Sequence, residues 1–455
     1  MTEYNLTVKQ FLDRSDDIDY RDFSSKLKGK LEKLNKDLKF SHKLGDLKKE
    51  KTGQLNGLVF SAKDNICVKN VESTAGSKIL KGYKPPFDAT AVKRFKKAGG
   101  NFLCKTNQDE FGFGTFSTNS AYEVPKNPLD NKRVCGGSSG GAACLTKALD
   151  MPHIALSEST GGSISCPSAF CSVVGLTPTY GLVSRYGLID YANSLDKIGP
   201  MGKSVYDVAL GLSVIAGKDK RDQTSFGKVK DYTNLDGKLT GKVIGVPKEY
   251  FENVDKKIEK RIRNVISKME DEGAKVKDVS LPNTKYALSS YYIIATSEAS
   301  TNLSKLCGMR YGLHKDLKRN FDEYFSNVRE EGFGEEAKRR IMLGTFARMS
   351  GYRDAYYLKA LKVRTKIIED FKRAFGDVDV LAAPTMPIMP PRFEDVEKLS
   401  PLEQYQMDVL TVPANLAGLP MINVPVKDMI GLHLIGDHKK EQNLLNIAKG
   451  VEDIL

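Results

Sequence analysis

The spacing of apolar residues changes along the chain between helical and strand periods. In residues 254–273 apolar side chains recur every three or four positions, which predicts an amphipathic helix that ends at Gly273. Residues 89–97 predict a second helix, stopped by two glycines. Short apolar runs predict buried strands at 101–106 (NFLCKT), 243–247 (VIGVP), VDVLAAPT and LPMINVPV. This alternation favours an α/β fold in which helices cover a mixed or largely parallel sheet.

Two further segments are predicted to be helical. Near the N-terminus, leucines recur at helical spacing from Leu27 to Leu38, and the region from about 286 to 374 is helical in pattern almost throughout. No change in composition marks a linker. We therefore expect a single domain over residues 1–455, with an N-terminal helical segment (1–54) and a helical insertion (about 286–374).

The chain is basic, with 70 Lys and Arg against 57 Asp and Glu and a net charge of +13. The densest basic stretch holds ten lysines between Lys26 and Lys51 and coincides with the N-terminal leucine pattern. A solvated helix face explains it better than a nucleic-acid site does. No apolar run approaches the roughly 20 residues of a membrane span, and the N-terminus has no secretory pattern. We expect a cytoplasmic protein that does not enter a membrane.

The seven cysteines do not form a recognisable pattern. Their number is odd and no Cys-x-x-Cys pair occurs, so a disulfide framework is not indicated. Cys166 and Cys171 lie five residues apart without a second pair or a nearby histidine. We expect no metal site, and interpret these cysteines as small buried side chains.

Three stretches hold more glycine and serine than packing requires: GLVFSAKDNI (57–66), VCGGSSGGAACL (134–145) and ESTGGSISCPSAF (158–170). The glycines of the second could form a phosphate-binding nest or simply turn a strand into a helix. A serine becomes nucleophilic only when a base removes its proton, and none of the five histidines lies in these stretches. Lys63 is the alternative base, because burial against apolar neighbours favours a neutral amine. It could instead pair with Asp64.

Together these stretches resemble the three core elements of the amidase signature family of serine hydrolases. Five further stretches resemble its branch of A subunits of tRNA-dependent amidotransferases: KTNQDEFGFGT (105–115), residues 173–200, KRRIMLGTF (338–346), LKVRTKI (361–367) and DVLTVPANLAGLP (408–420). The resemblance covers most of the chain from about Leu55. It implies the amidase-signature fold, a central mixed sheet with helices on both faces.

The resemblance also implies a Ser–cis-Ser–Lys mechanism. Ser163 corresponds to the nucleophile, Ser138 to the bridging serine after a cis peptide bond, and Lys63 to the terminal base. Backbone N–H groups of Thr160, Gly161 and Gly162 correspond to the oxyanion hole, where glycine lets the backbone approach the substrate closely.

The family's glutamine-binding residues also have counterparts in this chain. Arg340 corresponds to the arginine that holds the α-carboxylate of glutamine and Asp408 to the aspartate that holds its α-amino group. Tyr291 lies in a pocket-lining stretch. The alternatives from the residues alone are a basic helix face for Arg340, a helix cap for Asp408 and a core position for Tyr291.

The chain departs from the family in the nucleophile stretch, where the usual form is Asp-Thr-Gly-Gly-Ser-Ile-Arg. Ser159 replaces the aspartate and Ser165 the arginine. Because both partners of a charge pair are replaced, we expect no unpaired buried charge and interpret the change as compensated, somewhat as in archaeal members. The spacing from Ser138 to Ser163 is about one residue longer than usual, with the extra residue near KALDMPH.

These parallels imply a glutaminase subunit that releases ammonia from glutamine. A partner B subunit would use the ammonia, with ATP and Mg²⁺ of its own, to amidate misacylated Glu-tRNA(Gln) or Asp-tRNA(Asn), and a C subunit would brace the pair. This chain itself is expected to need no cofactor. Two alternatives are a free-standing hydrolase of another small amide and an inactive RNA-binding scaffold.

Overall fold

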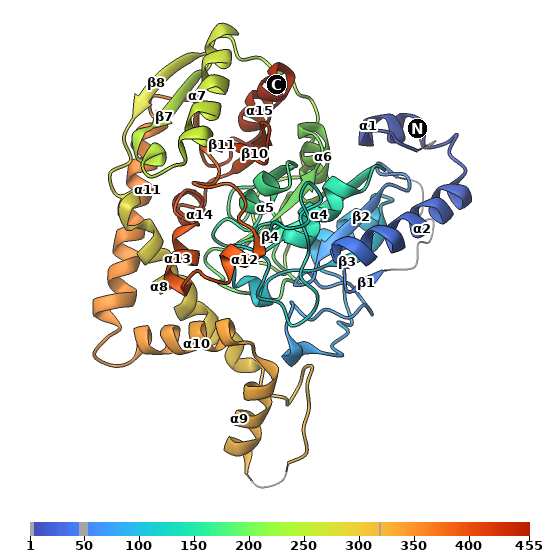
Figure 1. Ribbon diagram of the computed structural model, residues 1–455, viewed down its shortest axis with the longest axis vertical. Helices are drawn as coiled ribbons and strands as arrows, with labels where there is room; N and C mark the ends of the chain where they lie inside the picture. The colour runs from blue at the N-terminus through green and yellow to red at the C-terminus, as the bar shows by residue number, and fades with distance from the viewer. Residues whose placement is uncertain (1–3, 45–52, 318–319) are drawn as a thin grey trace.

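A computed structural model describes residues 4–44, 53–317 and 320–455 of the chain (Figure 1). Its centre is one mixed sheet of eleven strands in the order β1-β3-β2-β4-β6-β5-β10-β11-β9-β7-β8. The strands are β1 (Lys43–Leu44), β2 (Val59–Lys63), β3 (Asn101–Thr106), β4 (His153–Ser159), β5 (Val174–Thr177), β6 (Lys197–Gly202), β7 (Val243–Pro247), β8 (Lys275–Val279), β9 (Val380–Pro384), β10 (Met421–Pro425) and β11 (Gly431–Gly436). Every strand predicted from the apolar runs is present.

Fifteen α-helices lie in the described residues. They are α1 (Val8–Asp13), α2 (Tyr20–Leu38), α3 (Thr90–Lys97), α4 (Gly140–Ala148), α5 (Ser165–Phe170), α6 (Val205–Ile215), α7 (Lys256–Asp271), α8 (Ala287–Asn302), α9 (Phe321–Gly332), α10 (Glu335–Arg348), α11 (Lys359–Ala374), α12 (Phe393–Val396), α13 (Pro401–Gln406), α14 (Val412–Leu416) and α15 (Glu441–Ile454). None of them is both long and apolar enough to cross a membrane.

Helices cover both faces of the sheet, because adjacent side chains of a strand point to opposite sides. On β4, His153 lies against Thr146 of α4, with 3.4 Å between Nδ1 and Oγ1. The next residue, Ile154, lies against Gly211 of α6 on the other face. Helix α5 contacts α4, whereas α3 and α15 contact α6. The predicted fold class, a mixed sheet between two helical layers, is confirmed.

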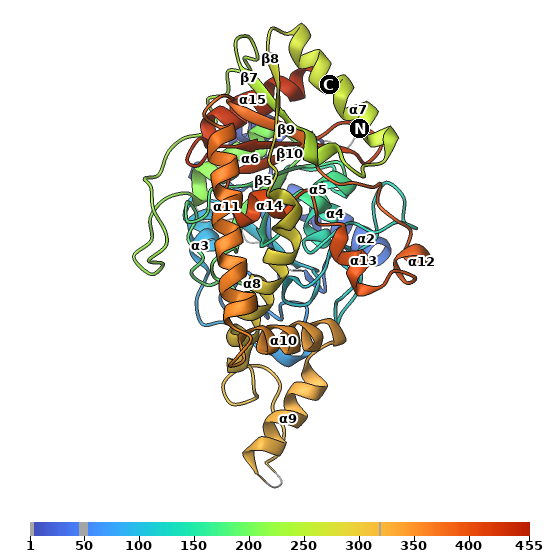
Figure 2. The ribbon, with the colours of Figure 1, turned by 90° about the vertical axis from the view of Figure 1, so that its left-hand side faces the viewer.

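The terminal and inserted helices correspond in part to the predicted segments. Helix α2 buries Leu27 and Leu31, as the leucine spacing predicts. Lys48, Lys49 and Lys51 of the basic stretch lie outside the described residues. Between 286 and 374 the chain forms α8, α9, α10 and α11; α8 and α11 run side by side at the front of Figure 2, and α10 and α9 lie below them.

Strand order brings two of the glycine-rich stretches to one edge of the sheet. Strands β2 and β4 are parallel neighbours, with Ala62 opposite Leu156. Their carboxyl ends therefore lie side by side, and these ends carry Lys63 and Glu158. The chain then turns from β4 into α5, and the remaining glycine-rich stretch enters α4 close by.

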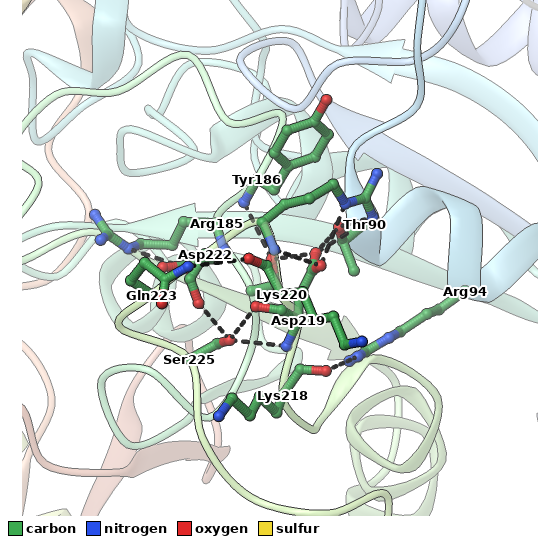
Figure 3. Close-up of polar contacts among 12 residues, drawn as sticks. Thr90, Arg94, Arg185, Tyr186, Lys218, Asp219, Lys220, Asp222, Gln223 and Ser225 are labelled. Carbon is green, nitrogen blue, oxygen red and sulfur yellow. Dashed lines mark hydrogen bonds and ion pairs between the residues drawn. The ribbon is translucent and has the colours of Figure 1, made fainter.

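A polar cluster holds the connection between β5 and β6 in place (Figure 3). The Arg94 guanidinium of α3 donates to the carbonyl oxygens of Ala216 (2.9 Å) and Gly217 (3.1 Å), just after α6. The loop that follows supplies Asp222, whose Oδ2 accepts from the Arg185 N–H at 2.8 Å. Hydrogen bonds to Thr90 and other neighbours hold the pKa of Asp219 well below its usual range despite partial burial. The cluster thereby ties the loop after α6 to Ser184 and Arg185, in the connection between β5 and β6.

Candidate active site

Lys63 is fully buried at the end of β2 and its ammonium group has three acceptors. Its Nζ donates to Ser138 Oγ at 2.7 Å, to the carbonyl of Glu158 at 3.0 Å and to Glu158 Oε2 at 2.9 Å. The peptide bond before Ser138 is cis. The structure thus joins the predicted bridging serine directly to the predicted base.

Lys63 does not pair with Asp64, and apolar neighbours alone do not surround it. Asp64 Oδ2 accepts hydrogen bonds from the backbone of Thr74 at 3.0 Å and of Gly76 at 3.2 Å. The carboxylate on Lys63 belongs to Glu158, which comes from the neighbouring strand. The expected burial of Lys63 is confirmed, whereas the alternative pairing with Asp64 is wrong, because a parallel neighbouring strand supplies the carboxylate.

Glu158 belongs to a buried network. Asn65 Nδ2 donates to its Oε2 at 3.0 Å, and the Thr160 hydroxyl lies 2.7 Å from its Oε1. The same hydroxyl lies 2.8 Å from Asp196 Oδ1. Burial, and next the charge of Glu158, raise the pKa of Asp196 well above its usual range. Glu158 is the only carboxylate in residues 157–171, but the sequence does not indicate its partners.

Ser163 lies in the turn between β4 and α5 and is 7% exposed. Within the described residues, no group accepts a hydrogen bond from the backbone N–H of Gly161, Gly162 or Ser163. These amides are therefore available to an oxyanion. The side chains of Ser163 and Ser138 are not hydrogen-bonded to each other; such contacts commonly tighten only when substrate binds.

Gly161 lies directly against an aromatic ring. A Cβ at this position would be 2.6 Å from Tyr291 Cζ and Oη, too close for a real contact. We predict that Gly161→Ala lowers kcat by about 10²-fold, because a shift of about 1 Å in a catalytic loop costs that much. Gly29→Ala in α2, where a Cβ meets nothing within 4 Å, is the matched control and keeps full activity. A Gly161→Ala enzyme with normal kcat would contradict this account of the turn.

Ser159 and Ser165 are both fully buried. Among the described residues neither hydroxyl has a hydrogen-bond partner. Ser159 faces Lys197 across the β4–β6 pair, so the position of the usual aspartate borders a buried lysine. In the described residues no carboxylate pairs with Lys197, whose Nζ donates to the Leu419 carbonyl at 3.2 Å, and burial lowers the pKa of Lys197 to about 7. The replacements therefore leave two unsatisfied hydroxyl groups and a buried lysine without an ion-pair partner, so the expectation of no unpaired buried charge is wrong at Lys197.

Arg340 is buried on α10 and has fixed partners. Its Nε donates to Glu336 Oε1 and its Nη1 to the Tyr191 hydroxyl, each at 2.7 Å. Its guanidinium also lies over the rings of Tyr292 (5.2 Å) and Tyr405 (5.1 Å). A buried guanidinium held in this way presents its remaining donors in a fixed direction, which suits a carboxylate. It does not lie on an exposed basic face.

Asp408 is joined to Arg340 through a tyrosine. The Tyr292 hydroxyl donates to Asp408 Oδ2 at 2.8 Å, and the Thr115 hydroxyl donates to Oδ1 at 3.1 Å. Burial raises the pKa of Asp408 to about 6. Tyr291 packs edge-on against Tyr292, with 5.0 Å between ring centroids, and against Gly161. The structure therefore brings Tyr291, Arg340 and Asp408 beside the turn that carries Ser163.

Several residues that contact Arg340 were not predicted. Glu336 lies four residues before Arg340 on the same helix, so helical spacing could have identified it as a partner. Tyr292, Tyr405 and Tyr191 come from separate parts of the chain, and no local pattern distinguishes them from core tyrosines.

The glycines of the second stretch do not form an anion-binding nest. The N–H of Gly137 donates to Thr115 O at 2.6 Å, that of Gly140 to Ser117 Oγ at 2.9 Å and that of Gly141 to Asn107 O at 3.1 Å. Because these amides already have protein acceptors, the turn serves to place Ser138 and start α4. In the described part of the chain, no group of three or more His, Cys, Asp or Glu side chains could hold a metal ion.

Known proteins resemble this chain over nearly its whole length. The amidase family model matches residues 8–445. The A subunit of the glutamyl-tRNA(Gln) amidotransferase of Methanococcoides burtonii is 50% identical over 412 residues, which cover 89% of this chain and 86% of the relative. The protein of the same name from Halothermothrix orenii is 49% identical with the same coverage.

The crystal structure of the A subunit of the glutamyl-tRNA(Gln) amidotransferase from Thermotoga maritima has a similar fold, with a TM-score of 0.85 and 36% identity. The match covers 100% of this chain and 96% of that one. Archaeal proteins are among the relatives. The chain belongs to the amidase family, in the group of the glutamyl-tRNA(Gln) amidotransferase A subunits.

Proposed function

We propose that this protein is the glutaminase subunit of a tRNA-dependent amidotransferase. The observation that carries the proposal is the pairing of a buried cation and a carboxyl group, Arg340 and Asp408, through Tyr292 beside Gly161. An α-amino acid presents the opposite charges, a carboxylate and an ammonium. A side-chain amide two methylenes from these groups, as in glutamine, suits a pocket of this kind.

In the proposed reaction Ser163 attacks the side-chain amide carbon while its proton passes to Ser138 and on toward Lys63. The N–H groups of Thr160 to Ser163 stabilise the negative charge on the amide oxygen. The C–N bond breaks, ammonia leaves with a proton returned along the same path, and water hydrolyses the glutamyl ester.

The rest of the proposed activity lies outside this chain. A partner B subunit receives the ammonia and amidates Glu-tRNA(Gln), Asp-tRNA(Asn) or both in the cytoplasm, using ATP and Mg²⁺ that it binds itself, and a C subunit braces the pair. Support comes from the relatives, whose names describe one component of an amidotransferase acting on glutamyl-tRNA(Gln). Amidation assays of the co-purified complex with each misacylated tRNA test this part.

The charge of Asp408 predicts a pH dependence of glutamine use. With a pKa of about 6, the carboxyl group is ionised above that pH and binds the α-ammonium, and it becomes neutral as the pH falls through 6. We expect kcat/KM for glutamine to fall about tenfold per pH unit below 6. Asp408→Asn should lower kcat/KM at pH 7.5 at least about 30-fold, the loss of about 2 kcal/mol, and should remove this dependence.

The control substrate is 4-carbamoylbutanoate, which is glutamine without its α-amino group. Its hydrolysis should be equally slow in the wild type and in Asp408→Asn. A free-standing amidase for another amide predicts instead that Asp408→Asn has little effect on either substrate.

A further inference from the structure

The three acceptors around Lys63 raise a problem for its use as a base. An amine accepts a proton only through a lone pair. Paired as an ammonium with the Glu158 carboxylate, Lys63 directs its three N–H bonds to Ser138 Oγ and to two oxygens of Glu158. An ammonium has no lone pair. Lys63 must therefore give up a proton before it can take one from Ser138.

Hydrogen-bond counting assigns the charge of Glu158. Lys63, Asn65 and the Thr160 hydroxyl all approach its two carboxylate oxygens, at 2.9, 3.0 and 2.7 Å. An ionised carboxylate only accepts, so three donors fit an anion. Glu158 is 1% exposed and Lys63 is fully buried, so water does not compete for either group.

The same counting places a proton on Asp196. The Thr160 hydroxyl has one hydrogen but lies within hydrogen-bond distance of Glu158 Oε1 and Asp196 Oδ1. If that hydrogen points to Glu158, then Asp196 must be the donor to Thr160. The raised pKa of Asp196 agrees with this arrangement. A neutral Asp196 avoids a second anion beside Glu158, which within the described residues is the carboxylate that contacts Lys63.

We propose that Glu158 is the terminal proton acceptor of the site and that it acts through Lys63. One N–H bond of the Lys63 ammonium breaks as its proton forms an O–H bond with Glu158 Oε2, which leaves a lone pair on Nζ. That lone pair takes the proton of Ser138, and Ser138 takes the proton of Ser163. In total Ser163 loses one proton and Glu158 gains one; the return path delivers it to the leaving ammonia. This inference rests on the proposed function.

Other charged groups near the network must be separated from Glu158 in any pH experiment. Asp109 is fully buried, and this burial raises the pKa of its carboxyl group to about 6. The positive charges of Lys63 and Arg340 act in the opposite direction. The positive charge of Arg185 lowers the pKa of Asp196, against the effect of burial. Tyr191 and Glu158 both lie within 4 Å of the position that a Cβ on Gly112 would occupy. Since Asp408 affects binding of free substrate, kcat at saturating glutamine is the appropriate quantity.

The test is the pH profile of kcat for Glu158→Gln, which keeps the size of the side chain but cannot take a proton. We expect kcat at pH 7 to fall about 10²-fold, the usual contribution of general base catalysis. The acidic limb should move to higher pH, because Lys63 must then lose its proton to solvent, and activity should recover as the pH rises. Glu158→Asp, which restores a carboxylate, should keep the acidic limb at its wild-type position with reduced kcat.

Glu441→Gln is the matched control. Glu441 is also buried and its Oε1 accepts from the backbone of Thr179 at 3.0 Å, but no lysine contacts it in the described part of the chain. This variant should keep the wild-type profile. A lower kcat for Glu158→Gln with an unmoved or lowered acidic limb, or without recovery at high pH, overturns the proposal. The proposal is also overturned if the acidic limb of the kcat profile of Glu158→Asp moves to higher pH. This second variant provides the test if Glu158→Gln does not fold.

Failure of the glutaminase assignment can be distinguished from failure of the Glu158 proposal. If the wild type with its partners releases no ammonia from glutamine but hydrolyses a simpler amide, the glutaminase assignment fails and the same profiles are measured with that amide. Arg340 and Asp408 variants change KM for glutamine and leave the acidic limb of kcat in place, so a binding defect is not mistaken for loss of the acceptor.

Discussion

Replacing Ser163 by alanine is expected to lower ammonia release from glutamine by about 10⁶-fold, the loss seen when a serine hydrolase loses its nucleophile. The hydroxyl of Ser163 is the only group in the turn that we assign to covalent attack. Because the side chain is small and nearly buried, the variant should fold normally. Ammonia release measured with a coupled assay and the thermal melting temperature give the two readouts.

Ser165→Ala is the control from the same stretch. It removes a buried hydroxyl that has no partner among the described residues, so activity should change by less than a few fold and stability should stay equal or rise. If Ser163→Ala kept more than about 1% of the wild-type rate, the nucleophile would have to be sought elsewhere, and the inactive-scaffold alternative would gain support from an inactive wild type.

Lys63→Met should have the second largest effect, because it removes activity and also destabilises the fold. Met has a similar length but leaves the Glu158 carboxylate buried without its cation. Breaking a buried ion pair in this way costs about 3–5 kcal/mol. Urea unfolding should therefore show a lower midpoint for Lys63→Met than for the wild type.

The double variant Lys63→Met/Glu158→Gln separates stability from chemistry. With the carboxylate removed as well, most of the lost stability should return, while the enzyme stays inactive. A single Lys63→Met variant as stable as the wild type would mean that water or a neighbouring group compensates Glu158.

Much of the sheet was predictable because buried strands have a distinctive sequence. The runs at 101–106 and 243–247 form strands with the expected bounds, and VDVLAAPT (378–385) forms a strand over 380–384. Lys63, Ser138 and Ser163 were identified because three stretches rich in glycine and serine resemble a known family, although the spacing from Ser138 to Ser163 is about one residue longer. Their assignment to roles stays a prediction.

The partners of these residues were not predictable, for a physical reason. Lys63 meets Glu158 because β2 and β4 are parallel neighbours, and strand order is not encoded within either strand. Asp196 reaches Thr160 because the segment before β6 returns to the same edge. A local pattern reports which face of an element is buried, but not which distant element covers it.

The order of the site along the chain has a consequence for how such enzymes can be altered. Residues assigned to bond breaking lie between Lys63 and Ser163, whereas those assigned to recognition, Tyr291, Arg340 and Asp408, all come later. A library of variants confined to α8, α10 and the turn before α14 would therefore diversify the accepted amide and leave the proton path untouched. Segment exchange between relatives, with a junction after β6, is the corresponding recombination experiment.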